Sequence, residues 1–290
     1  MSAAVEQPAV GLPDVPAVLA QERGENFTVA GRLLPRAVRA DFRALYGYAR
    51  LVDDAGDEIE GDRLAALDWI EQDLDRAFAG RARHPLLRAL EPAIERHALP
   101  RAELVALIDA NRMDQRVSRY ETFADLRASC ALSADPVGRL VLRVLGAATP
   151  ERIALSDDVC TGLQIVEHCQ DVAEDYARGR VYLPQEDLRR FGVSEDELRG
   201  PVAGGTASPA LRDLIAFECD RAQELLRAGV PLARSLHGRA RFAIAAFTAG
   251  GRAALGAIAA SRNDVLAGPP KASKARRAAA LVRTLTEVAR

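Results

Sequence analysis

Hydrophobic residues recur at intervals of three and four positions along most of this chain, which is the period of an α-helix that buries one face. Runs in which apolar and polar residues alternate, as in half-buried strands, are almost missing from the sequence. Glycine and proline positions mark turns between the periodic stretches. The pattern predicts an all-α fold with helices over residues 35–57, 62–79, 86–97, 101–117, 122–145, 151–177, 208–230 and 236–262.

Length and composition favour one helical domain. The chain has 290 residues, of which 49% are hydrophobic and 28% charged, and this balance is typical of a globular protein. No linker-like composition or repeat period divides it, so we expect a single domain over residues 25–268. A poorly ordered segment would precede it over residues 1–24, and a basic helix or tail would follow over residues 269–290. Because 39 basic side chains nearly balance 41 acidic ones, no nucleic-acid partner is expected.

The cysteines and the apolar stretches indicate a cytoplasmic protein. The four cysteines lack the spacing of a zinc site or of a disulfide framework. The N-terminal residues lack the features of a signal peptide, and the longest apolar stretch, residues 242–251, is too short to span a membrane. The last 20 residues carry six basic side chains against the single acid Glu287. This segment predicts either a solvated terminal helix or a peripheral contact with the inner face of the plasma membrane.

The first candidate site lies in the helix predicted over residues 35–57. Asp53 and Asp57 are four residues apart and therefore share one helix face, with Arg50 and Tyr46 on the preceding turns. Two carboxylates at this spacing repel each other, which suggests that a cation lies between them in the working protein. Mg²⁺ fits, because it prefers hard oxygen ligands and commonly bridges carboxylates to a substrate phosphate. An ordinary solvated acidic face is the alternative.

A second acidic pair strengthens the metal hypothesis. Asp171 and Asp175 repeat the four-residue spacing in the helix predicted over residues 151–177, where Gln164 and His168 share their face. Two acidic faces together with arginines would form a clamp for a diphosphate, with Mg²⁺ on the aspartates and guanidinium groups on the remaining phosphate oxygens.

A diphosphate clamp of this kind serves to ionise a carbon–oxygen bond. The resulting carbocation survives only where water is excluded, so we expect an apolar helical cavity, with the segment 230–258 as a candidate lining. The glycine-rich segment 187–207 is a candidate lid over the clamp, or else a mobile connection.

Several sequence blocks occur in a characteristic order. They are Glu25-Asn-Phe27, Arg32-Leu-Leu-Pro35, Leu45-Tyr46, the first acidic motif, Tyr120-Glu-Thr-Phe123, Ser133-Ala-Asp-Pro136, the second acidic motif, and Arg178-Gly-Arg180-Val-Tyr182-Leu-Pro184. Together they cover nearly the whole chain and resemble the squalene and phytoene synthases, most of all the hydroxysqualene synthases (HpnC) of the bacterial hopanoid pathway. The resemblance implies the class I isoprenoid synthase fold, a helical bundle around a central apolar cavity.

The resemblance also implies a reaction and its residues. Presqualene diphosphate would lose diphosphate, rearrange and capture water to give hydroxysqualene. The implied Mg²⁺ and diphosphate ligands are Asp53, Asp57, Asp171 and Asp175, and the implied phosphate contacts are Arg50, Arg178 and Arg180. We also assign Glu167 to the metal site, Tyr46 to catalysis, and Gln164, His168 and Tyr182 to substrate binding.

Two departures from the family pattern keep other functions open. Glu167 stands where the family usually has Asn, and Ser129 stands where a Tyr commonly precedes the cysteine. The second departure weakens the case for making presqualene diphosphate. The alternatives are a synthase that condenses two farnesyl or geranylgeranyl diphosphates, and a non-catalytic helical subunit. Association with other enzymes of the squalene pathway is a further expectation.

Overall fold

The computed structural model describes residues 11–12, 35–200 and 206–290. They fall into two compact units, each considered by itself: Met1–Arg116 with Pro136–Thr149, and Val117–Asp135 with Pro150–Arg290. The described residues form helices and a single isolated bridge between Arg119 and Val181, which confirms the predicted all-α class. Two of the sequence blocks, at residues 25–27 and 32–34, lie outside the described residues. The segment 1–24, expected to be poorly ordered, also lies outside them except for residues 11–12.

The first unit is built around α3 (Arg36–Asp57), which packs against α4 (Arg63–Phe78), α5 (Pro85–His97) and α6 (Arg101–Asp114). One face of α3 is fully buried, and its Tyr48 hydroxyl donates a 2.8 Å hydrogen bond to the Leu104 carbonyl of α6. Burying a phenol is favourable only when its hydroxyl finds such a partner. This bond therefore fixes how α6 lies along α3. Most of α8 (Asp135–Val144) also belongs to this unit.

The second unit has α9 (Pro150–Gln170) and α12 (Pro209–Leu226) as its main packed pair. Gly162 lies at their contact, where an added Cβ would come within 3.1 Å of the Ala222 carbonyl oxygen, so its lack of a side chain lets the helices approach closely. The remaining elements of the unit are α7 (Phe123–Ser133), α10 (Val172–Ala177), α11 (Gln185–Phe191), η2 (Glu195–Leu198), α13 (Gly229–Arg234), α14 (Gly238–Ala260) and α15 (Lys274–Ala289).

The predicted helix boundaries are correct where helices end at strong turn signals and wrong where two helices adjoin. The helix predicted over residues 122–145 is α7 followed by α8, because Pro136 lacks an N–H and can stand only in the first turn of a helix. The helix predicted over residues 151–177 is interrupted at Asp171, which separates α9 from α10. The helix predicted over residues 208–230 ends at Leu226, and α13 then begins at Gly229.

The candidate lid at residues 187–207 is not a loop in its described part. It contains the end of α11 and the short helix η2, and Leu198 and Asp187 are only 1% and 2% exposed. Its role as a lid, or as a mobile connection, stays a prediction, and residues 201–205 lie outside the described part of the chain. Leu188, Val193, Leu198 and Ala207 of this segment belong to the packed core of the second unit.

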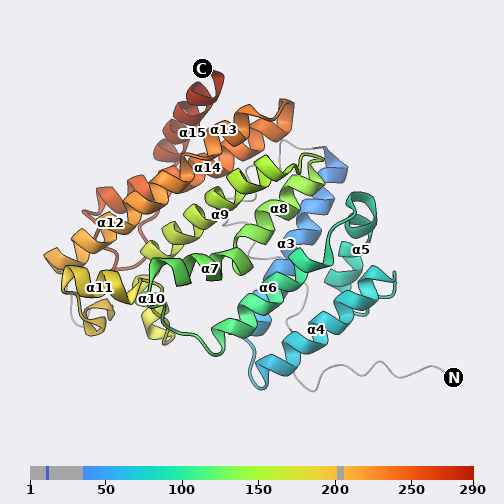
Figure 1. The fold of residues 1–290 in the computed structure, drawn as a ribbon, viewed down its shortest axis with the longest axis horizontal. Helices are drawn as coiled ribbons and strands as arrows, with labels where there is room; N and C mark the ends of the chain where they lie inside the picture. The colour runs from blue at the N-terminus through green and yellow to red at the C-terminus, as the bar shows by residue number, and fades with distance from the viewer. Residues whose placement is uncertain (1–10, 13–34, 201–205) are drawn as a thin grey trace. The chain divides into compact units, whose positions relative to one another are not determined.

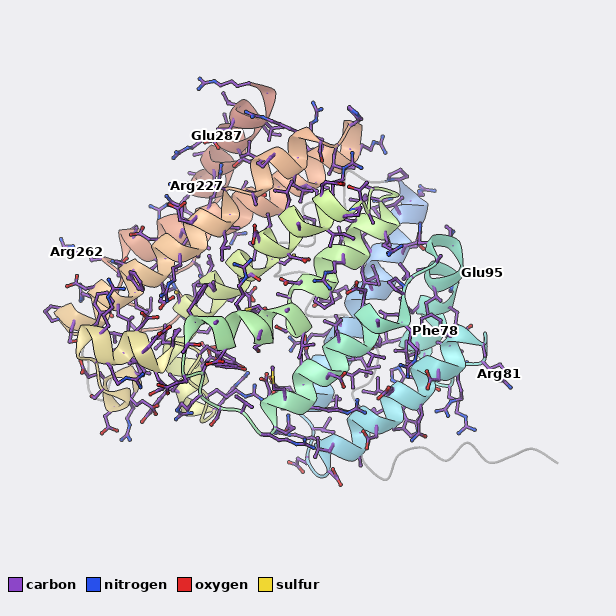
Figure 2. The ribbon with its side chains drawn as sticks, in the orientation of Figure 1. Phe78, Arg81, Glu95, Arg227, Arg262 and Glu287 are labelled. Carbon is purple, nitrogen blue, oxygen red and sulfur yellow. The ribbon has the colours of Figure 1, made fainter. Side chains whose placement is uncertain are left out.

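The basic C-terminal segment forms α15, which packs on α13 and α14. Glu287 of α15 accepts hydrogen bonds from Arg252 of α14 and from Arg283, and Figure 2 shows Glu287 near the C-terminus. Val282 is 65% exposed. Within the described part of the chain, α14 is the helix long and apolar enough to cross a membrane, and over half of its most apolar window is buried inside the protein.

Candidate functional site

The first acidic motif occupies the last two turns of α3. Asp53 accepts a 3.1 Å hydrogen bond from the side-chain amide of Asn111 on α6. Arg50 forms an ion pair with the buried Asp54, four residues further on, with 2.8 Å between Arg50 Nε and Asp54 Oδ1. Sequence spacing alone could not tell this pair from a pair with Asp53. The motif therefore depends on a contact between α3 and α6 as well as on helical spacing.

A glycine makes the contact with Asn111 possible. A Cβ on Gly56 would lie 2.1 Å from Asn111 Oδ1, so only glycine lets that side chain reach across to Asp53. The neighbouring Gln115 donates a 3.0 Å hydrogen bond to the Gly56 carbonyl. Asn111 is a site residue that the sequence analysis missed, because a lone Asn in a helix carries no motif.

The surroundings of Asp53 disfavour its charge. Loss of hydration within the protein raises the pKa of Asp53 to about 6, although the side chain still has an exposed surface. The hydrogen bond from Asn111 and the charge of Arg50 oppose this rise, while Asp57 adds to it. A nearby cation would offset the free-energy cost of keeping these carboxylates charged.

The second acidic motif lies at the break between α9 and α10. Asp171 has φ −102° and ψ 14°, yet the Asp171 N–H still donates to the Glu167 carbonyl and the Asp175 N–H donates to the Asp171 carbonyl. The two aspartates thus keep the helical i, i+4 relation across the interruption.

Both aspartates of this motif have raised pKa values. Burial raises the pKa of Asp171 to about 6, with Glu174 adding to the rise. Burial raises the pKa of Asp175 to about 7, with Asp171 adding to it, and Arg180 and Arg178 opposing it. Arginines 178 and 180 therefore already act electrostatically on the acids that the sequence analysis assigned to the same site.

Aromatic rings stack beside the second motif. The rings of His168 and Tyr182 lie 3.9 Å apart between centroids and are nearly parallel, and Tyr120 stacks on Tyr182 at 5.8 Å. The Tyr120 hydroxyl and the Ser129 hydroxyl are 3.0 Å apart, within hydrogen-bonding distance. Burial lowers the pKa of His168 to about 3, so its imidazole is neutral near pH 7. Tyr120 belongs to a quoted motif, but its place beside Tyr182 was not predicted.

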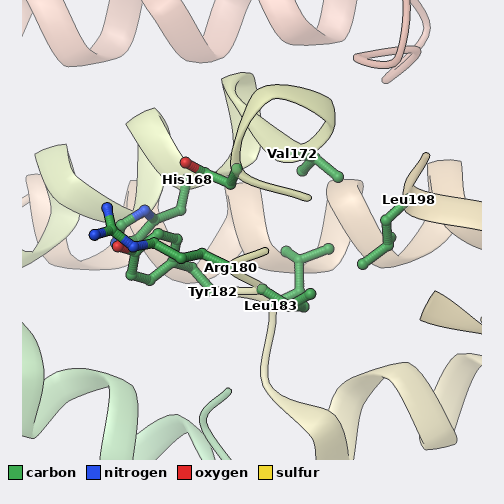
Figure 3. Close-up of a pocket in the computed structure, with 8 residues that line it drawn as sticks. His168, Val172, Arg180, Tyr182, Leu183 and Leu198 are labelled. Carbon is green, nitrogen blue, oxygen red and sulfur yellow. The ribbon is translucent and has the colours of Figure 1, made fainter. Parts of the chain in front are cut away.

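A small pocket brings several of these residues together. His168, Asp175, Arg180 and Tyr182 line it with the apolar side chains Val172, Val181, Leu183 and Leu198. Figure 3 shows His168, Arg180 and Tyr182 gathered at one end and Leu183 and Leu198 at the other. Its free volume of about 10 Å³ is about the size of one water molecule, so this pocket is no substrate cavity.

The other predicted site residues have varied surroundings. Tyr46 is 8% exposed, Gln164 is half-buried, and Glu167 is exposed. The structure groups Arg50, Asp53 and Asp57 on α3, and it groups the second motif with Arg180 and Tyr182. The expected meeting of the two acidic motifs over a central cavity stays a prediction. Within the described residues, no three His, Cys, Asp or Glu side chains come together as a metal site of their own.

The sequence matches the family model "Squalene/phytoene synthase" over residues 20–277. The chain belongs to the squalene/phytoene synthase family. This membership confirms the resemblance found in the sequence motifs, from the first acidic motif to the Arg178–Pro184 block.

Relatives within the squalene/phytoene synthase family carry different names. The chain is 33% identical to the phytoene synthase of Mycobacterium tuberculosis over 271 residues, which cover 90% of this chain and 87% of that protein. It is 34% identical to the hydroxysqualene synthase of Sinorhizobium fredii over 214 residues, covering 72% and 70%. The crystal structure of squalene synthase HpnC from Alicyclobacillus acidocaldarius has a TM-score of 0.76 and 43% identity, covering 84% of this chain and 91% of that one. The isoprenoid synthase fold is thereby confirmed.

Proposed function

We propose that this protein is a Mg²⁺-dependent hydroxysqualene synthase that converts presqualene diphosphate to hydroxysqualene. The observation that carries the proposal is the interaction of the half-buried Asp175 with the charges of Arg180 and Arg178 at the second motif, in a chain 43% identical to HpnC. The first motif supports it with a second carboxylate pair on α3. A non-catalytic subunit would need neither pair.

The donor set fits Mg²⁺. Each motif offers two carboxylates, and Mg²⁺ is commonly held by one or two carboxylates together with water and substrate phosphate oxygens. The raised pKa values of Asp53, Asp171 and Asp175 mean that positive charge close to these groups would be favourable. Asp53, Asp57, Asp171 and Asp175 would hold the ions, with Glu167 beside them. The bound metal would supply Lewis-acid stabilisation of the leaving diphosphate.

The protein side chains have separate tasks in this proposal. Arg178 and Arg180 would bind the diphosphate oxygens through their planar donor groups, and Arg50 would contribute from α3. The carbon–oxygen bond breaks with both electrons leaving on diphosphate, and the cation that remains is rearranged and captured by one water, which gives up a proton. Tyr46 and Tyr182 are the proposed aromatic neighbours of the cation. The neutral His168 ring would support Tyr182 without adding a competing positive charge.

A second candidate is a condensing synthase that joins two prenyl diphosphates. The relative that favours it is the phytoene synthase of Mycobacterium tuberculosis, which matches over more of the chain than the hydroxysqualene synthase of Sinorhizobium fredii does. Both reactions use the same acidic motifs, so those motifs do not separate them. A cytoplasmic location, membrane contact through α15, and association with other squalene-pathway enzymes stay predictions.

The deciding experiment supplies purified protein and Mg²⁺ with either presqualene diphosphate or farnesyl diphosphate, without reduced nicotinamide. Lipid products are identified by mass spectrometry. We expect hydroxysqualene from the first substrate and no product from the second. Presqualene diphosphate formed from farnesyl diphosphate would assign the condensing function, and no turnover of either substrate, or of geranylgeranyl diphosphate, would favour the non-catalytic subunit.

A further inference from the structure

We infer that Arg119 is a positioning residue that holds the backbone between Arg178 and Arg180 in the conformation that binds diphosphate. The inference rests on the proposed function for the identity of the ligand. Its structural basis is a set of contacts within the second unit, between residues 118–121, residues 178–186 and η2.

The Arg119 guanidinium bridges three chain segments. Its NH1 group donates to the Gly179 carbonyl at 2.6 Å and to the Ser118 carbonyl at 2.8 Å, and its Nε donates to Glu195 Oε1 on η2 at 2.8 Å. Gly179 stands directly between the two arginines assigned to the diphosphate. A planar group with fixed donors is suited to holding acceptors in set directions, which a flexible ammonium does less well.

Main-chain hydrogen bonds continue the same attachment. The Val181 N–H donates to the Ser118 carbonyl at 2.9 Å, and the Gln185 N–H donates to the Tyr120 carbonyl at 2.9 Å. These bonds fix the segment after Arg180. On the other side, the N–H groups of Arg178, Gly179 and Arg180 donate to carbonyls of α10. The bond from Arg119 to the Gly179 carbonyl joins this turn to the segment around residue 119.

Gly179 is exposed, and the space where a side chain would lie is open. Its φ is +82°, a conformation that suits glycine, and an added Cβ would meet no atom within 4 Å. Glycine has the largest conformational freedom of any residue, so a hydrogen bond to the Gly179 carbonyl limits rotation of the peptide groups between the two arginines. The hydrogen bond to its carbonyl supplies the restraint that packing does not.

Glu195 holds the guanidinium in place. It accepts from Arg119 and also from the Gln185 side chain at 2.9 Å, and these contacts lower the pKa of the Glu195 carboxyl. The carboxylate is therefore charged at neutral pH and orients Arg119 toward Gly179. Sequence spacing gave no sign of this link, because residues 119, 179 and 195 are far apart along the chain.

The test compares Arg119→Ala with Arg189→Ala in the full chain. Arg189 is the matched control, since it makes an exposed 2.5 Å ion pair with Glu121 in the same region but has no bond to Gly179. Hydrogen exchange is measured on peptides covering residues 178–182, and affinity for inorganic diphosphate is measured by calorimetry with Mg²⁺. For Arg119→Ala we expect exchange about tenfold faster and binding about tenfold weaker, and for Arg189→Ala changes within about twofold.

Arg119→Lys separates positioning from charge. It keeps the positive charge but lacks the planar bridge, so we expect it to behave like Arg119→Ala. Full recovery of diphosphate affinity in the Lys variant would show that only the charge matters and would overturn the inference. Unchanged exchange at residues 178–182 in Arg119→Ala, or unchanged diphosphate affinity, would overturn it too. Wild-type protein that binds no diphosphate would instead refute the proposed function, and exchange would still report whether the bridge exists.

Discussion

Replacing Glu218 with glutamine is expected to make the stability of the second unit less dependent on pH. Glu218 is 1% exposed on α12 and receives a 3.0 Å hydrogen bond from Arg221. The same guanidinium donates to Asp187 of α11 at 2.5 Å and lies over the rings of Phe123 and Phe217. This cluster matters for the site because α11 begins directly after the Arg178–Pro184 segment.

The expected effect follows from the pKa of Glu218. Burial raises it from 4.5 to about 7, with Arg221 opposing the rise and Asp187 adding to it. The folded protein binds the Glu218 proton more tightly than the unfolded chain does. This binding therefore contributes its full stabilising free energy below about pH 4.5, and the contribution is lost as the pH rises through about 7. The whole titration corresponds to about 3 kcal/mol, of which about 2 kcal/mol falls between roughly pH 5.5 and pH 8.5.

The assay is urea unfolding followed by circular dichroism at several pH values across that range. The Glu218→Gln side chain stays uncharged at every pH and keeps an acceptor for Arg221. From about pH 5.5 to about pH 8.5 the free energy of unfolding of wild type should therefore fall by about 2 kcal/mol more than that of the variant. Glu224→Gln is the control, because Glu224 is an exposed partner of Arg227 on the same helix and should change little. A wild type and a Glu218→Gln variant that lose stability in parallel as pH rises would refute the reasoning.

Three further predictions concern the site. Asp171→Asn is expected to lower turnover of the diphosphate substrate by about 100-fold or more with an unchanged helical circular dichroism spectrum, and retained activity would contradict the metal assignment. Gly56→Ala is expected to cost about 1–3 kcal/mol in urea unfolding, because its Cβ would displace Asn111; an unchanged midpoint would show that α6 shifts at no cost. His168→Ala should cost about 1–3 kcal/mol by loss of the stack on Tyr182, and His168→Phe should cost less; equal losses would mean that a ring nitrogen is required.

Helices with clear turn signals could be predicted closely from the sequence. The segments predicted over residues 35–57 and 62–79 are observed as α3 and α4 with shifts of one residue. Asp62 explains the start of α4, since its side chain accepts from the Ala65 N–H. The junction of α7 and α8 was missed although Pro136 was visible, because periodicity alone continues through a short break.

The sequence by itself determined the helical class, the family and the two acid pairs, because helical period and i, i+4 spacing are local properties of the chain. Only the tertiary structure decided which partners those residues have. Arg50 pairs with Asp54, Asn111 reaches Asp53 past Gly56, and Arg119 holds Gly179 across 60 residues of chain. Such contacts depend on how helices pack and loops close, and packing joins residues whose separation in sequence carries no periodic signal.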